Sequence, residues 1–422
     1  MTIVLVVVAV AAVLALLALV HRWLWIRLVR DTTAPGGPAR RAGTAVAVAL
    51  PVLALAALVA GRAGAPFWLE RVVAWPGYLW LAVLLYLAMA MAVAEPVRAV
   101  WLRRYAAPAP APAAAAAVLR GSAPDSAPRT PAEPSGAAAG PDGEGAAGLD
   151  RRVFVARVLG GAAVAVAGGT VGNGAYGVLR GPRVKRVQVP LAKLPRAAHG
   201  FRIAVVSDVH LGPVLGRAHT QRIVDTVNRT QPDLIAIVGD LVDGSVHDLG
   251  PAAEPLRLLR ARHGSYFVTG NHEYFSGAQQ WVDHVRELGL TPLENARHAL
   301  AHFDLAGVND VQGESEGHGP DFRAALGDRD RTRTAVLLAH QPVVIHDAVR
   351  HGVDLQLSGH THGGQLWPGN HVAELANPTV AGLERYGDTQ LYVSRGAGAW
   401  GPPVRVGAPS DITVVELASY QA

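Results

Sequence analysis

Three long runs of uncharged, apolar residues within the first 105 positions limit most strongly what this chain can fold into. They occupy residues 2–20, about 43–60 and about 74–94. Each is close to the roughly 20 residues that a helix needs to cross a bilayer core. Trp75, Tyr78 and Trp80 would lie in an aromatic belt at the membrane surface. We therefore predict three transmembrane helices in residues 1–105. A cleaved signal peptide is the alternative for the first run, but two further runs follow it and no basic region precedes it.

Two segments separate these runs from the rest of the chain. Residues 106–150 are rich in Ala and Pro and contain too few large apolar side chains to offset the entropy of folding, which predicts a disordered linker. Residues 151–182 begin with Arg151 and Arg152 and continue into a weakly apolar Ala/Gly run. This pattern resembles a twin-arginine export signal displaced to an internal position, and a fourth transmembrane helix is the alternative. On either interpretation the segment enters the bilayer.

The arginines near these runs predict the orientation of the chain. They cluster between the first and second runs, and again after the third, at Arg22, Arg27, Arg30, Arg40, Arg41, Arg98, Arg103 and Arg104. Because arginine favours the cytoplasmic side, both clusters should lie there, and a fourth crossing would carry residues 190–422 out of the cytoplasm. The basic stretch from Arg180 to Arg186 argues against this placement. We predict a multi-pass protein of the cell membrane with an extracytoplasmic globular domain.

Composition excludes several kinds of chemistry. The chain has no cysteine, so disulfides and thiolate catalysis are excluded, and a metal site must use His, Asp, Glu, Asn or backbone oxygens. No basic stripe carries interleaved aromatic residues of the kind on which single-stranded nucleic acid stacks, so nucleic acid is not an expected partner. The sequence gives no indication of protein partners or oligomeric state.

From about residue 190 the pattern is that of an α/β domain. Near-continuous apolar runs, typical of strands buried on both faces, occupy residues 202–208, 234–240, 265–271, 335–340 and 354–360. The intervening segments 217–231, 255–262 and 277–288 have helical spacing. Strands that alternate with helices favour an α/β sandwich, whose site would lie outside the carboxyl ends of the strands.

Each predicted strand ends at, or is followed by, a side chain that can bind a metal. The candidates are Asp208, His210, Asp240, Asn271, His272, His340, His360 and His362. Oxygen and imidazole donors without sulfur suit Mn²⁺, Fe²⁺ or Zn²⁺, and seven such ligands are enough for two ions roughly 3.5–4 Å apart. In an extended segment His360 and His362 would point to one side. Gly363 and Gly364 would let the backbone approach the ions without a Cβ in the way.

The ordered set DxH (208–210), GDxxD (239–243), GNHE (270–273), His340 and GHTH (359–362) resembles the calcineurin-like metallophosphoesterase family. The nearest resemblance is to its membrane-attached bacterial branch of YkuE and YaeI type. It covers about residues 200–417 and does not include the first three apolar runs. It implies a β-sandwich flanked by helices, preceded here by N-terminal transmembrane helices.

The resemblance also implies a role for each candidate residue. Asp208, His210 and His362 would hold one divalent ion, Asn271, His340 and His360 the other, and Asp240 would bridge the two. A metal-bridging hydroxide would be the nucleophile. His272 would protonate the leaving group or stabilise charge on the phosphoryl oxygens; a hydrogen-bonded structural role is its alternative. For four residues near the motifs, surface or packing roles are favoured over contact with substrate: Asp243, Tyr274, Arg217 and Trp400.

These inferences favour a membrane-anchored, dimetal phosphohydrolase, above all a phosphodiesterase, acting outside the cytoplasm. A lipid or cell-envelope phosphoester is the preferred substrate because the domain is tethered close to the bilayer. Two alternatives stay open. One is a pyrophosphatase of the UDP-2,3-diacylglucosamine hydrolase type, acting on a lipid precursor. The other is a non-catalytic, metal-binding membrane scaffold.

Overall fold

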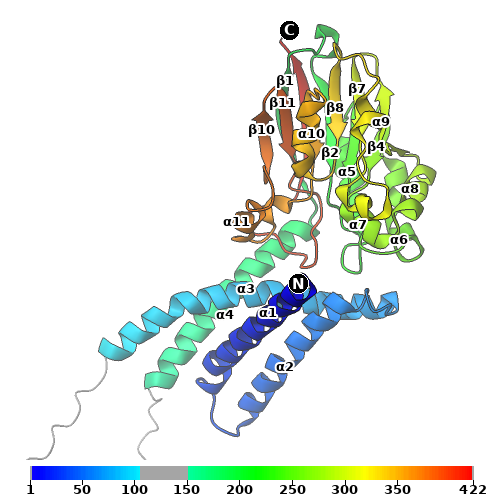
Figure 1. Ribbon diagram of the computed structural model, residues 1–422. Helices are drawn as coiled ribbons and strands as arrows, with labels where there is room; N and C mark the ends of the chain where they lie inside the picture. Colours follow the sequence, from blue (N-terminus) through cyan, green and yellow to red (C-terminus); the bar gives the residue numbers. More distant parts are fainter. Residues whose placement is uncertain (1, 105–150, 421–422) are drawn as a thin grey trace, which may run out of the picture. The chain divides into compact units, whose positions relative to one another are not determined.

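The computed structural model describes residues 2–104 and 151–420, and the chain divides into two compact units (Figure 1). The first unit comprises Met1–Gly43 and Ala90–Ala163, and the second comprises Thr44–Met89 and Val164–Ala422. The predicted linker at 106–150 lies outside the described residues.

Within the described residues, four helices are long and apolar enough to cross a membrane. They are α1 (Thr2–Trp25), α2 (Pro38–Val59), α3 (Phe67–Arg104) and α4 (Arg151–Leu179). The helix α1 exposes large apolar side chains, including Val7, Leu14 and Leu19, on a scale that suits lipid better than water. The apolar runs predict where the helices lie but not where they begin and end. For example, α1 continues beyond residue 20 and passes into the π-helix η1 (Ile26–Arg30).

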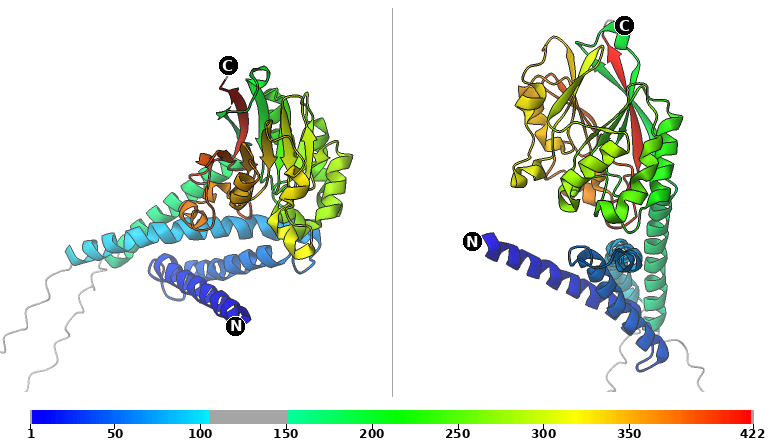
Figure 2. Two further views of the ribbon diagram at one scale, coloured as in Figure 1. Left: turned by 45° about the horizontal axis from the view of Figure 1, so that its top comes forward. Right: turned by 90° about the vertical axis from the view of Figure 1, so that its right-hand side faces the viewer.

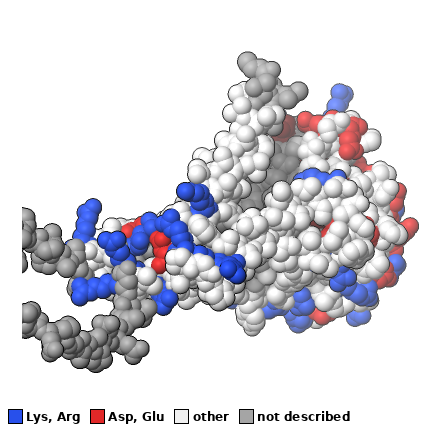
Figure 3. Space-filling view, turned by 90° about the horizontal axis from the view of Figure 1, so that it is seen from below, with Lys and Arg blue, Asp and Glu red and all other residues white. Residues whose placement is uncertain are grey.

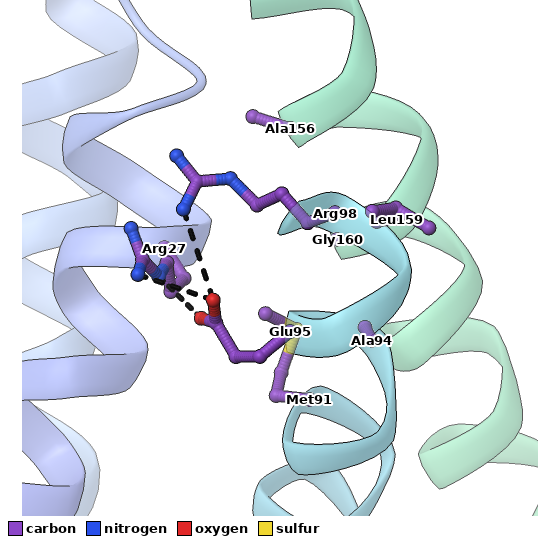
Figure 4. Close-up of a pocket in the computed structure, with 8 residues that line it drawn as sticks. All are labelled: Arg27, Met91, Ala94, Glu95, Arg98, Ala156, Leu159 and Gly160. Carbon is purple, nitrogen blue, oxygen red and sulfur yellow. Dashed lines mark hydrogen bonds and ion pairs between the residues drawn. The ribbon is translucent and has the colours of Figure 1, made fainter. Parts of the chain in front are cut away.

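A network of ion pairs packs η1 against α3 in the first unit. Glu95 accepts hydrogen bonds from the Arg27 guanidinium, at 2.5 Å from Nε, and from Trp23 Nε1 at 3.2 Å. Arg98 lies 3.8 Å from Glu95 (Figure 4). It also lies 3.6 Å from Asp31. Arg27 and Arg98, two of the arginines from which the orientation is predicted, thus lie on helical segments and pair with carboxylates. Figure 3 shows Lys and Arg side chains gathered in this part of the surface, beside the grey residues.

Two six-stranded sheets form the globular part of the second unit (Figures 1 and 2). In spatial order, the first sheet contains β1 (Arg183–Leu191), β12 (Asp411–Ser419), β2 (Phe201–Val206), β3 (Leu234–Val238), β4 (Ser265–Val268) and β5 (Thr291–Pro292). The second contains β10 (Gly382–Tyr386), β11 (Thr389–Val393), β9 (Leu355–Ser358), β8 (Thr334–Leu338), β7 (Phe303–Gly307) and β6 (Ala296–Ala299). The strands β2 to β5 pair in parallel, as do β7, β8, β9 and β11.

Apolar side chains fill three layers of this sandwich. The central layer joins the two sheets and includes Ile203, Phe303 and Tyr392. The first sheet packs its outer face on α5 (Arg217–Arg229), α6 (Val246–Ala253) and α8 (Ala278–Glu287), and the second packs on α9 (Phe322–Leu326) and α10 (Ile345–Arg350). The predicted α/β sandwich flanked by helices is therefore confirmed.

Short helical elements complete the chain between the strands. They are η2 (Arg196–Ala198), η3 (Glu254–Leu258), α7 (Asn271–Ser276), η4 (Val311–Glu316), η5 (Pro342–Val344), η6 (His362–Gly364) and α11 (Gly369–Ala373). The helical prediction at 255–262 is wrong beyond residue 258, and the part that is helical is the 3₁₀ turn η3. Pro255 favours the start of a helix, but the helical segment ends after residue 258 because the chain then turns toward β4.

Replacing His219 with Leu should stabilise the protein, more at pH 5 than at pH 8. His219 is 1% exposed in α5, and neither ring nitrogen has a hydrogen-bond partner. Burial, aided by Arg222 and Arg405, lowers its pKa to about 3. The unfolded chain, with a histidine pKa of about 6.5, binds the proton more readily, so folding stability falls as pH drops below that value, by about 2 kcal/mol at pH 5.

Thermal unfolding of full-length protein in detergent tests this expectation. The variant should have the higher unfolding temperature at both values of pH, with a larger gap at pH 5. His247→Leu, on the exposed surface of α6, is the matched control. Equal gaps at both values of pH would contradict a buried, neutral His219.

Candidate metal centre

The candidate ligands lie just beyond the carboxyl ends of five strands, where the two sheets meet. Asp208 and His210 follow β2, Asp240 follows β3 and Asn271 begins α7 after β4. From the second sheet, His340 follows β8, and His360 and His362 follow β9. Because these strands are parallel to their neighbours within each sheet, their ends meet at one edge. Residues distant in sequence are thereby brought together, as the motif pattern predicts.

The backbone at these residues is held in an unusual conformation. Asp208, His210, Asp240, His360 and His362 all have positive φ, between 49° and 74°. Non-glycine residues rarely adopt this region, and such strain gathers at functional sites. It also corrects one expectation. His360 and His362 face the same cluster, but they lie beyond β9 on a left-handed turn rather than on an extended segment.

The glycines that permit close packing around the ligands differ from the predicted pair. A Cβ at Gly363 would meet Arg395, and one at Gly364 would meet Asn370, so neither glycine faces the ligand cluster. Instead, a Cβ at Gly270 would collide with Asp240, and one at Gly359 would collide with Asp208. The glycines that precede the ligands, rather than those that follow, therefore admit the carboxylates.

The donor atoms form one cluster, buried except at Asn271 and His360, which are partly exposed. The Nε2 atoms of His210 and His362 are 3.0 Å apart, and Asp208 Oδ1 lies 3.4 Å from His362 Nε2. Asp240 Oδ2 lies 3.1 Å from His340 Nε2 and 3.7 Å from His210 Nε2. Asn271 Oδ1 lies 3.0 Å from His360 Nδ1. Two groups of donors close enough to share an ion are Asp208, His210 and His362, and Asp240, His340 and His360; a third joins His210, Asp240 and His272.

This donor set fits divalent cations. Asp208 Oδ2 is buried and lacks a hydrogen-bond partner. Leaving such an atom unpaired is costly unless another group satisfies it. Burial and the neighbouring Asp240 carboxylate also raise the pKa of Asp208, as expected where a carboxylate lacks enough positive charge around it. Oxygen and imidazole donors without sulfur would satisfy a borderline or hard divalent ion.

Asp240 favours the charged forms of two imidazoles in the cluster, those of His210 and His340, and they favour the charged form of Asp240. Burial opposes ionisation of Asp240, but the imidazoles of His340 and His210 outweigh it and lower the Asp240 pKa. Burial likewise opposes protonation of His210, yet Asp243 and Asp240 raise its pKa to about 9. The site therefore concentrates negative charge at Asp240, between the two donor groups.

Asp243 contributes more to the site than its predicted surface or packing role. Its Oδ1 lies 2.6 Å from His272 Nδ1 and 3.0 Å from His210 Nδ1. One carboxylate thus fixes the ring orientation of a candidate ligand and of His272. His272 is 15% exposed at its side chain, and its backbone N–H donates to Asp240 Oδ1 at 2.9 Å. The GDxxD spacing was the signal for Asp243, because the turn after β3 carries both carboxylates.

Two further residues hold the site in place and had not been assigned to it. Glu273 is fully buried, and its carboxylate accepts hydrogen bonds from the backbone N–H groups of Gly270, Asp240 and Leu241, at 2.6, 3.0 and 2.7 Å. Arg405 is buried behind His362 and donates to its carbonyl oxygen at 3.0 Å. Glu273 belongs to the GNHE motif, whereas nothing in the sequence around Arg405 marks it.

The other three residues near the motifs, Trp400, Tyr274 and Arg217, make different contacts. The Trp400 ring lies 5.6 Å from the His272 ring. Tyr274 contacts the carbonyl oxygen of His318 at 3.3 Å, and Arg217 donates to the carbonyl oxygen of Pro251 at 3.0 Å. Trp400 is therefore the one of these three placed beside His272.

Replacing Glu273 with Ala should destabilise the full-length protein. Three backbone N–H groups that pair with Glu273 would be left in a buried site, at a cost of about 3 kcal/mol or more. The apparent unfolding temperature should fall by about 6–12 °C. Glu287→Ala, at a side chain that is 73% exposed, is the control and should change it little. An unchanged unfolding temperature for Glu273→Ala would mean that these hydrogen bonds do not fix the site.

The sequence is similar to known proteins over the region that builds this cluster. The Calcineurin-like phosphoesterase family matches residues 201–364. A zebrafish (Danio rerio) "Transmembrane protein with metallophosphoesterase domain" is 40% identical over 250 residues, which cover 56% of this chain and 57% of that protein. The chain thus spans little more than half the length of this relative.

Two bacterial relatives are covered more fully. An uncharacterised metallophosphoesterase from Aquifex aeolicus is 33% identical over 240 residues, which cover 56% of this chain and 91% of that protein. The uncharacterised metallophosphoesterase YkuE from Bacillus subtilis is 28% identical over 288 residues, covering 64% of this chain and 98% of that protein.

Proposed function

Because the chain belongs to the calcineurin-like metallophosphoesterase family, whose members are metal-dependent hydrolases, we propose that it hydrolyses a phosphodiester with two divalent ions. The observation that carries this proposal is the convergence of seven oxygen and nitrogen donors, five of them on buried residues, beside the His272–Asp243 pair. In this proposal Asp208, His210 and His362 hold one ion, Asn271, His340 and His360 hold the other, and Asp240 serves both. Manganese, iron and zinc ions all suit these donors.

Two ions bound there would lower the pKa of a water molecule and stabilise negative charge on the phosphoryl oxygens. The protein's own contribution is orientation and proton transfer. In the doubly protonated form of His272, Nδ1–H donates to Asp243 and Nε2–H is left to give its proton to the leaving oxygen, which leaves the ring neutral. The same carboxylate fixes the His210 ring. A purely structural metal site has no need of a partly exposed histidine held in this way, which argues against a non-catalytic scaffold.

The membrane helices support a phosphoester substrate from the lipid bilayer or cell envelope. The chain runs from α4 into β1 within a few residues, which gives the catalytic domain little reach. A phosphodiester is favoured, with a pyrophosphate-linked lipid precursor as the alternative. The positions of the arginines favour a multi-pass protein with this domain outside the cytoplasm.

Hydrolysis by purified full-length protein in detergent tests the proposed reaction. The substrates are an aryl phosphodiester and the matching monoester, each assayed with Mn²⁺ and after chelation. The diester should be cleaved faster than the monoester, chelation should abolish cleavage and Mn²⁺ should restore it. Cleavage that persists after thorough chelation would contradict a metal-dependent reaction, and faster cleavage of the monoester would contradict the diester preference.

Cysteine labelling in intact cells tests the orientation. The chain has no cysteine, so single substitutions are labelled without background. A membrane-impermeant maleimide should label Asp388→Cys, in the exposed turn between β10 and β11, but not Ala34→Cys, in the connection before α2. Labelling of Ala34→Cys alone would place the catalytic domain in the cytoplasm.

A further inference from the structure

A cleft of about 570 Å³ in the second unit joins the candidate metal centre to two membrane helices. One wall carries His210, Asp243 and His272, together with the exposed rings of Phe275 and Trp400. The other wall comes from the end of α2, the connection at residues 60–66 and the start of α3. We call this second wall the hairpin wall. It contains Leu58, Arg62 and Phe67 among its lining residues.

Contacts within the second unit fix the hairpin wall in place. Phe67 packs against the hydrophobic core of the catalytic domain, and Tyr86 of α3 donates a hydrogen bond of 2.9 Å to the carbonyl oxygen of Trp367. The two helices are themselves closely packed. Tyr78 bonds the carbonyl oxygen of Ala57 at 3.1 Å, and a Cβ at Gly77 would lie only 2.7 Å from the Ala57 Cβ. The hairpin wall is therefore positioned by helix packing on one side and by the domain on the other.

The number of membrane crossings independently permits this arrangement. If all four helices span the bilayer, two crossings, α3 and α4, separate the α2–α3 connection from the domain that follows α4. The hairpin wall and the catalytic domain thus emerge on the same side of the membrane, whichever side that is.

Both apolar and charged side chains line the cleft. Leu58 is 46% exposed, Phe275 is 63% exposed and Trp400 is 55% exposed, so apolar surface faces the cleft from both walls. Among the described residues that line it, Arg62 is the single Lys or Arg, and it shares the cleft with the carboxylates Glu70, Asp243 and Asp248. The apolar surface fits an alkyl part of a substrate, and Arg62 is the one guanidinium of the described lining that can pair with a phosphate.

We propose that the hairpin wall is part of the substrate site, and that the cleft binds an amphiphilic phosphodiester. Its alkyl part lies along Leu58, and Arg62 attracts its negative charge toward the metal centre. This inference rests on the proposed phosphodiesterase activity and specifies its substrate class. It makes Leu58 and Arg62 specificity-determining residues that belong to the membrane helices rather than to the catalytic domain.

Two matched substrates and three variants of full-length protein in detergent test the inference. Both substrates are nitrophenyl phosphodiesters; the second ester group is methyl in one and a hexadecyl chain in the other. Wild type should prefer the hexadecyl ester. Leu58→Ala should lower kcat/KM for that ester about fivefold to tenfold through lost apolar contact, and leave the methyl ester within about twofold. Arg62→Gln should lower kcat/KM for the hexadecyl ester about tenfold.

Arg71→Gln is the matched control, because Arg71 is an exposed residue of α3 that does not line the cleft. It should leave both esters unchanged. If wild type cleaves neither ester, the proposed phosphodiesterase activity fails and the inference falls with it. If wild type cleaves both esters equally well, or if Arg71→Gln loses as much as Arg62→Gln, the activity stands but the hairpin wall does not select substrate.

Discussion

Replacing Asp240 with Asn should abolish phosphodiester hydrolysis and reduce the bound metal. Asp240 Oδ2 lies 3.1 Å from His340 Nε2 and 3.7 Å from His210 Nε2, between the two donor groups. An Asn side chain can still accept the His272 N–H, so the local fold should survive. It would remove the negative charge between the two donor groups and put an NH₂ group where an oxygen ligand is proposed. We expect kcat/KM to fall about 10³-fold or more.

Metal content and kinetics on the same preparation distinguish this effect from misfolding. Metal analysis of purified full-length protein should give two ions per chain for wild type and fewer for Asp240→Asn, with an unchanged far-UV circular dichroism spectrum. Asp225→Asn makes the same chemical change on the exposed face of α5 and is the control. Full metal content and activity in Asp240→Asn would show that Asp240 does not serve both ions.

Two features of the sequence made the candidate site predictable: the strands are buried, and the motifs follow one another in a recognisable order. β2, β3, β4, β8 and β9 are almost fully buried, so their apolar runs are continuous and easily recognised. Ligands at the ends of such strands meet because the strands are parallel. Local sequence was sufficient here because each donor belongs to a strand end and not to a variable loop.

The residues that hold the ligands were harder to predict because their partners are distant in sequence. Arg405 supports His362 across 43 positions, and no local pattern signals that contact. Asp243 and Glu273 lie within motifs, but their roles depend on which atoms the folded turns bring near, including backbone N–H groups. The positive φ values at Asp208 and His360 are likewise imposed by the surrounding packing.

The proposed role of the hairpin wall could not be predicted from the sequence either, because it too depends on contacts that are distant in sequence. The apolar runs that predict α2 and α3 carry no sign that their connection lines a catalytic cleft, because a bilayer-spanning helix needs only length and hydrophobicity. Its function depends on where the following domain places His272. That placement follows from tertiary packing at Phe67 and Tyr86, which no periodicity reveals.

Replacing His272 with Ala should slow hydrolysis according to the leaving group. If His272 donates a proton to the leaving oxygen, an alkyl ester needs that proton because an unprotonated alkoxide leaves poorly. A nitrophenolate leaves without it. We expect kcat to fall about 10²–10⁴-fold for an alkyl ester, and much less for a nitrophenyl ester. Asp243→Asn should act in the same direction, because His272 Nδ1 loses its carboxylate partner at 2.6 Å.

A comparison of two esters separates proton donation from other roles of His272. Full-length His272→Ala should retain two metal ions, because seven other side chains supply the donors. His247→Ala changes an exposed histidine of α6 and should leave both rates unchanged. If His272→Ala slows both esters by the same factor while metal content is retained, His272 stabilises charge on the phosphoryl oxygens instead of protonating the leaving group. If metal is lost as well, His272 is a ligand, consistent with the third donor group that joins it to His210 and Asp240.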